Sequence, residues 1–195
     1  MTSDSQLSTV LVVEDEHSLA DLFEMFLESK YTVHTAHDGA TALELMSDEV
    51  DVVLLDRRMP GISGEEVLKA IRAEGYDCRV AMVTAVTPDV DIIEMGFDEY
   101  LTKPVTRTEL LETVDQLVEL ASYDELIQEY YQLISTKATL EVEKDDRYLA
   151  ENEEYAQLTA RMAELKVQLR STEESLSDVD VRSLIIQGGV QTDTE

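Results

Sequence analysis

The 195-residue sequence contains one cysteine, three prolines, seven glycines and no tryptophan. Because Cys78 has no second cysteine to pair with, the chain forms neither an intrachain disulfide nor a cysteine-rich metal site. No apolar run is long enough to span a bilayer, and the first six residues lack the basic and apolar regions of a signal peptide. These absences predict a cytoplasmic protein with no membrane segment.

Basic residues are also scarce: 15 Lys and Arg stand against 43 Asp and Glu, for a formal net charge of −28. Repulsion among so many carboxylates destabilises a compact state at low ionic strength, whereas concentrated salt screens it. The composition therefore suggests a halophilic protein in a salt-rich cytoplasm. A disordered acidic protein is the alternative, but the periodic apolar pattern argues against it. The shortage of clustered cations argues against direct nucleic-acid binding.

Short apolar runs alternate with amphipathic segments over the first two thirds of the chain. The runs predict strands at residues 9–13, 31–35, 52–55, 79–84 and 99–102. Apolar residues at helical spacing predict helices after the first, second, third and fifth strands, whereas residues 87–96 have room for little more than two helical turns. This alternation predicts an α/β fold, a doubly wound five-stranded parallel sheet covered on both faces.

A helical region is predicted to follow at Ser122, which fits a capping box with Glu125. Two neighbouring apolar stripes then run along one helix, namely Leu126, Tyr130 and Leu133, and Ile127, Tyr131, Ile134 and Ala138. Residues 141–147 are poor in apolar side chains, so two helices at about 122–150 and 153–175 are expected to fold back as an antiparallel hairpin. The alternative is one continuous helix that forms a coiled coil with a second chain.

The expected domain organisation has four parts. Residues 1–8 are a disordered N-terminus and residues 9–121 form the α/β domain. Residues 122–176 form a helical appendage, and residues 177–195 are an acidic flexible tail.

Polar side chains follow or end four of the predicted strands. They are Glu14 and Asp15 after the first, Asp56 after the third, Thr84 at the end of the fourth and Lys103 after the fifth. Parallel sheets bind ligands at the carboxyl ends of their strands, so these groups are expected to meet. Three carboxylates repel one another unless a cation joins them, and all-oxygen ligation favours Mg²⁺. With the lysine and the hydroxyl, the set describes a site that forms an aspartyl phosphate; a purely structural polar cluster is the alternative.

Residues 9–121 resemble the receiver domain of two-component response regulators, which has a flavodoxin-like fold. Four motifs carry the resemblance, in the family's order: Val-Val-Glu-Asp-Glu, Leu-Leu-Asp-Arg-Arg-Met-Pro-Gly, Val-Thr-Ala and Tyr-Leu-Thr-Lys-Pro. The resemblance implies a phosphoacceptor signalling protein rather than an enzyme. Such a protein catalyses only its own phosphorylation and dephosphorylation. A sensor histidine kinase would supply the phosphoryl group.

The resemblance also implies a metal site. Asp56 would be the phosphoacceptor, and Asp15 and Asp56 would bind Mg²⁺ directly. Glu14 would act mainly through water, and the backbone carbonyl of Arg58 would be the remaining protein ligand. The Arg58 side chain could overhang the site, so we hypothesise that it modulates the lifetime of the phosphate; a solvent-facing chain is the alternative.

Three further residues would respond to the phosphate. Lys103, in a cis peptide bond with Pro104, would neutralise it. Thr84 would move to bond it, and Tyr100 would be the switch aromatic that swings inward when Thr84 moves. The alternative for Tyr100 is an ordinary half-buried strand residue.

Residues 122–175 resemble HalX, a small helical domain that follows receivers in haloarchaeal proteins. Four stretches carry this resemblance: Tyr123-Asp124-Glu125-Leu126, Tyr130-Tyr131, Lys137-Ala138-Thr139-Leu140-Glu141 and Glu154-Tyr155-Ala156-Gln157-Leu158. The resemblance adds architecture rather than function. The expected output is a contact with a protein partner or a second copy through these helices, and transcriptional regulation through such a contact stays open.

Two other classes of function remain as alternatives. One is a non-phosphorylated, receiver-like scaffold that acts through its coiled coil. The other is an aspartate-nucleophile phosphohydrolase, which usually needs a second Asp two residues after the nucleophile, where this chain has Arg58.

Overall fold

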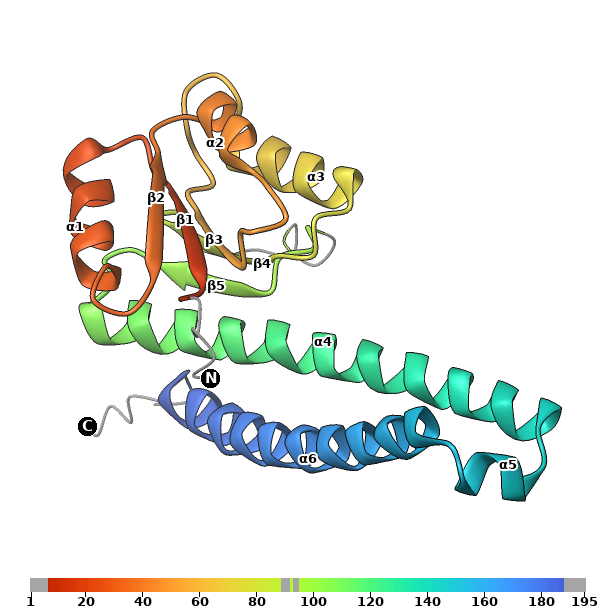
Figure 1. The fold of residues 1–195 in the computed structure, drawn as a ribbon. Helices are drawn as coiled ribbons and strands as arrows, with labels where there is room; N and C mark the ends of the chain where they lie inside the picture. Colours follow the sequence, from red (N-terminus) through yellow and green to blue (C-terminus); the bar gives the residue numbers. More distant parts are fainter. Residues whose placement is uncertain (1–6, 89–91, 93–94, 188–195) are drawn as a thin grey trace. The chain divides into compact units, whose positions relative to one another are not determined.

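The computed structural model describes residues 7–88, 92 and 95–187 (Figure 1). The chain divides into two compact units, a first unit of residues 1–121 and a helical unit of residues 122–195. Within the described ranges, no helix combines the length and the apolar character that crossing a membrane requires.

The first unit is built on a five-stranded parallel sheet. Its strands are β1 (Thr9–Val13), β2 (Thr32–Ala36), β3 (Val52–Leu55), β4 (Arg79–Thr84) and β5 (Glu99–Thr102), in the order β2-β1-β3-β4-β5. Val13 is level with Leu55, and Leu55 with Met82, so β1, β3 and β4 bring their carboxyl ends to one edge. The predicted parallel sheet is confirmed, with β2 one residue later than expected.

Alternate residues of the strands enter two separate cores. Val10 and Val12 of β1 pack on the face covered by α1 (His17–Leu27) and by residues 107–121 of α4 (Arg107–Glu143). Leu11 and Val13 pack on the other face, beneath α2 (Gly39–Leu45) and α3 (Gly64–Glu74). A sheet covered on both faces has strands that are apolar throughout, which is why β1 and β3 read as continuous apolar runs.

Local signals fix where α2 and α3 begin and end. The Asp38 carboxylate accepts the Thr41 N–H at 2.8 Å at the start of α2. Ser63 and Glu66 form a complete capping box at the start of α3, which ends at Gly75 in the left-handed conformation with φ of 82°. The capping box places the first turn of α3 directly after the loop that follows β3.

Parts of three predictions fall outside the described residues. The short helix expected at residues 87–96 falls partly on residues 89–91 and 93–94. The disordered N-terminus falls on residues 1–6, and the end of the flexible tail on residues 188–195.

The helical region differs from the prediction in its bounds. The predicted helix start at Ser122 is wrong, because α4 runs without a break from Arg107 to Glu143, although the two compact units do divide between Ala121 and Ser122. The flexible tail was expected from residue 177, but residues 177–187 belong to α6, which runs from Glu153 to Gln187. The sequence has no Gly or Pro from residue 106 to residue 186, so nothing interrupts propagation of the helix, and a potential capping pair alone does not end one.

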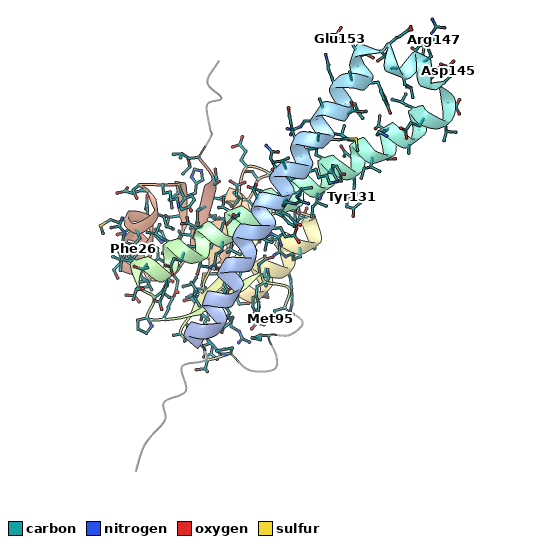
Figure 2. All side chains as sticks on the ribbon, turned by 90° about the horizontal axis from the view of Figure 1, so that it is seen from below. Phe26, Met95, Tyr131, Asp145, Arg147 and Glu153 are labelled. Carbon is teal, nitrogen blue, oxygen red and sulfur yellow. The ribbon has the colours of Figure 1, made fainter. Side chains whose placement is uncertain are left out.

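The helical unit is an antiparallel hairpin within one chain. The short helix α5 (Asp146–Ala150) lies in the turn, where Figure 2 shows Asp145, Arg147 and Glu153 at the closed end. The Arg161 guanidinium donates two hydrogen bonds to the Glu129 carboxylate, at 2.8 and 2.7 Å, so α6 folds back along α4. These contacts agree with the hairpin rather than with one continuous helix.

Candidate functional site

Three carboxylates gather at the carboxyl edge of the sheet. Glu14, Asp15 and Asp56 each bring an oxygen to within 4.8 Å of the other two. The backbone fixes two of them, because the Asp56 N–H donates to the Val13 carbonyl at 2.9 Å and the Glu14 N–H to the Ala36 carbonyl at 3.0 Å. Glu14 is 2% exposed and Asp56 8%, whereas Asp15 is more exposed.

One lysine partly balances this charge. The Lys103 Nζ lies 2.6 Å from Glu14 Oε2 and 2.5 Å from Asp56 Oδ2. The Lys103 N–H donates to the Thr84 carbonyl at 2.9 Å, and the predicted cis peptide bond to Pro104 is present. Three carboxylates and one ammonium leave a net charge of −2 when all are ionised, and all-oxygen ligands of that charge fit a divalent cation such as Mg²⁺.

Burial and ion pairing act in opposite directions on these groups. Burial raises the pKa of Glu14 above its ordinary value, although the Lys103 ammonium opposes this shift. Burial would lower the pKa of Lys103, but its hydrogen bonds to Asp56 and Glu14 more than offset this and raise the pKa. Lys103 is therefore held as a cation, while burial makes the Glu14 carboxylate easier to protonate than an exposed one, even with Lys103 beside it.

Arg58 contributes its backbone to the site. Its N–H donates to Asp56 Oδ1 at 3.1 Å, and its side chain is exposed. The exposed side chain agrees with both the modulator hypothesis and its solvent-facing alternative.

The side chains of Thr84 and Tyr100 both form a hydrogen bond with the backbone of the loop residue Val86. Thr84 is 1% exposed, and its hydroxyl oxygen accepts a long hydrogen bond from the Val86 N–H at 3.4 Å. The Tyr100 hydroxyl donates to the Val86 carbonyl at 2.7 Å, and the Tyr100 ring packs 5.5 Å from that of Phe97. The backbone of Val86 thus connects the two side chains.

Gly64 is a residue of the site that the sequence analysis missed. A Cβ at this position would lie 2.0 Å from the Asp56 carbonyl oxygen, and the Gly64 N–H donates to the Arg57 carbonyl at 3.0 Å. The Arg57 guanidinium also pairs with the Glu65 carboxylate at 2.7 Å. The first turn of α3 therefore packs directly against the backbone of Asp56. The sequence signal was a glycine immediately after the capping serine.

Family comparisons agree with this geometry. Residues 10–115 match the family model of the response regulator receiver domain, and residues 119–185 match that of the HalX domain. A Haloferax volcanii protein named "Putative transcriptional regulator" is 44% identical over 191 residues, which cover 90% of this chain and 32% of that protein. The chain thus spans about a third of the length of this relative.

Solved receiver structures share the fold of the first unit. The response regulator TrrA from Thermotoga maritima, solved in complex with Mg²⁺ and BeF, is 35% identical, with a TM-score of 0.51 over 56% of this chain and 98% of that one. The receiver domain of an HD domain-containing protein from Pseudomonas fluorescens is 27% identical, with a TM-score of 0.56 over 60% of this chain and 98% of that one.

The receiver family matches more than half of the chain, and the HalX match follows it directly. Both resemblances seen in the sequence are therefore confirmed. The chain belongs to the response-regulator receiver family, and a HalX domain directly follows its receiver domain.

Proposed function

We propose that Asp56 accepts a phosphoryl group from a sensor histidine kinase with the help of Mg²⁺, and that phosphorylation controls a protein contact of the helical unit. The observation that carries this proposal is the buried Asp56 carboxylate, 2.5 Å from the Lys103 ammonium and beside two further carboxylates. The name of the Haloferax volcanii relative makes transcriptional regulation the proposed setting. The protein would work in the cytoplasm and catalyse only its own phosphorylation and dephosphorylation.

The residues of the site divide the chemistry among them. A carboxylate oxygen of Asp56 attacks phosphorus as the bond from phosphorus to the donor breaks. Asp15, Asp56 and the Arg58 carbonyl would hold Mg²⁺, with Glu14 acting through water; when bound, the ion neutralises phosphoryl oxygens. Lys103 then exchanges a carboxylate oxygen for a phosphoryl oxygen, because the new group carries the greater charge.

The same charge change drives the proposed switch. Phosphorylation adds about −1.5 to −2 charge and three acceptor oxygens at Asp56. The Thr84 hydroxyl can donate to one of these oxygens, which draws it away from the Val86 N–H. Since Val86 also holds the Tyr100 hydroxyl, Tyr100 responds to the same movement. The population then shifts toward the packing that best accommodates the phosphate.

Incubation with a small phosphodonor and Mg²⁺ in concentrated salt tests the proposal. Intact mass spectrometry is expected to show one added phosphoryl group, and chelation of Mg²⁺ is expected to prevent the addition. No added mass under any condition would favour the non-phosphorylated scaffold instead. Continuous consumption of the phosphodonor without a lasting adduct would favour a phosphohydrolase, although Arg58 occupies the position of that class's second Asp.

Removal of the Arg58 side chain tests the modulator hypothesis. We expect Arg58→Ala to shorten the lifetime of the phosphate by about 1.5- to 5-fold, because an exposed charge pair contributes about 0.2–1 kcal/mol. The measurement is the decay of phosphorylated protein after removal of the donor. Arg58→Lys, which keeps the charge, is the matched control and is expected to retain most of the lifetime. Equal decay in all three proteins would show that Arg58 only faces solvent.

A further inference from the structure

The turn between β2 and α2, residues 37–39, lies against the carboxylate cluster. The His37 Nδ1 atom is 3.3 Å from the Glu14 carbonyl oxygen. A carbonyl oxygen can only accept, so Nδ1 carries the proton of this hydrogen bond. The Glu14 N–H donates to the Ala36 carbonyl at 3.0 Å. Both peptide groups of Glu14 are therefore bonded to consecutive residues, Ala36 at the end of β2 and His37 directly after it.

The carbonyl that His37 binds belongs to the peptide group that leads into Asp15. The carbonyl oxygen and the next Cα lie in one plane, so fixing the Glu14 oxygen also fixes the direction in which Asp15 leaves that plane. Lys103 holds the Glu14 and Asp56 carboxylates at 2.6 and 2.5 Å. Among the residues that the structure describes, none forms a hydrogen bond or an ion pair with the Asp15 carboxylate. The position of Asp15 therefore depends on its backbone.

Neighbouring contacts hold the half-buried His37 ring and its turn in place. The ring packs on that of His17, the first residue of α1, with 3.9 Å between the ring centroids. Two residues after His37, a Cβ on Gly39 would lie 2.6 Å from the Ile62 carbonyl oxygen. The turn thus packs directly on the loop between β3 and α3, and it contacts both backbone segments that carry the carboxylates.

We infer that His37 is a positioning residue for the divalent cation, because its hydrogen bond to the Glu14 carbonyl holds Asp15 in place. The inference rests on the proposed Mg²⁺ site and deepens it by naming a residue outside the ligand set that tunes its affinity. His37 does not touch the ion in this role. It holds the backbone of a ligand before the ion arrives, and a ligand held in position loses less conformational freedom on binding, so the ion is bound more tightly.

Calorimetric titration of the full-length chain with Mg²⁺ in concentrated KCl tests the inference. His37→Phe keeps a ring beside His17 but removes the donor, and we expect it to weaken Mg²⁺ binding about 5- to 10-fold. Residues that support a metal ligand directly change affinity by roughly 10- to 100-fold, and His37 acts one step further away, through a backbone carbonyl. His37→Asn restores an N–H donor near the position of Nδ1 and is expected to bind Mg²⁺ within about 2-fold of the wild type.

His34→Phe is the matched control, because His34 is exposed on β2 and lies outside the turn. It makes the same chemical change and should leave Mg²⁺ binding unchanged. The rate of phosphorylation by a small phosphodonor gives a second readout. His37→Phe should raise the Mg²⁺ concentration that half-saturates this rate and leave the rate at saturating Mg²⁺ unchanged. A general loss of packing would instead lower the saturated rate and the free energy of unfolding in urea.

Equal Mg²⁺ affinity in the wild type and His37→Phe would overturn the inference and leave the proposed function intact. Equally weak binding by His37→Phe and His37→Asn would overturn it as well, since the packing of the ring rather than its N–H would then be what matters. A wild type that binds no Mg²⁺ would reject the proposed metal site itself, and the inference with it. The titration of the wild type therefore distinguishes a failure of the proposed function from a failure of the inference alone.

Discussion

Asp56→Asn is expected to abolish phosphoryl uptake, with a rate at least about 1,000-fold below that of the wild type. An amide oxygen is a far weaker nucleophile than a carboxylate, and the variant also loses one charge of the proposed metal site. The fold should survive, because Lys103 keeps its ion pair with Glu14 at 2.6 Å and the asparagine oxygen can still accept from Lys103. Intact mass spectrometry after incubation with a small phosphodonor and Mg²⁺ measures the effect.

Asp48→Asn is the matched control for this prediction. Asp48 is exposed in the segment between α2 and β3, so its replacement makes the same chemical change away from the site. It should be phosphorylated at the wild-type rate. If Asp56→Asn accepted phosphate as fast as the control, the acceptor would be another residue and the assignment of Asp56 would be wrong.

Gly64→Ala is expected to cost about 3 kcal/mol of unfolding free energy and to slow phosphorylation. A Cβ at this position would lie 2.0 Å from the Asp56 carbonyl oxygen, and backbone cannot move aside as the end of a side chain can. Either α3 must shift from its capping box, or the loop that holds Asp56 must move. Urea unfolding followed by tyrosine fluorescence measures the first effect, and phosphoryl uptake measures the second.

Gly61→Ala provides the comparison. Gly61 has a φ of 79°, so alanine is strained there, but a Cβ would have open space around it. Its cost should be limited to about 1–2 kcal/mol of backbone strain, with little change in the geometry of Asp56. Equal losses of stability in the two variants would mean that α3 yields easily and does not hold Asp56 in place.

The sheet and the meeting of the site residues could be predicted because both follow from local patterns. Runs such as Val52–Leu55 end sharply at a carboxylate, and parallel strands carry such ends to one edge. The continuation of α4 through Ser122 was harder to predict. Capping propensity at Ser122 competes with helix propagation, and the sequence does not show which of the two is stronger. The role of Gly64 could not be predicted from the sequence. The atom that leaves no room for a Cβ there is the Asp56 carbonyl oxygen, which lies in the loop after β3.

The same limit applies to the ion pairs around Asp98. This carboxylate accepts from the Arg72 and Arg79 guanidinium groups at 2.8 and 2.7 Å and from the Val80 N–H at 2.8 Å. Its partners come from α3 and β4, while Asp98 itself precedes β5. No spacing in the sequence indicates such a three-way contact, because it depends on how the layers stack.

Thr84 and Tyr100 share one partner, the backbone of Val86. The Val86 N–H donates to the Thr84 hydroxyl, and the Val86 carbonyl accepts from the Tyr100 hydroxyl. A displacement of Val86 therefore alters both hydrogen bonds in one event. States in which only one bond has changed would leave a polar group without its partner and be sparsely populated. Under the proposed switch, the response of one molecule would therefore be all-or-none rather than graded. The strength of the output would be set by how many molecules have switched, and not by how far each has moved.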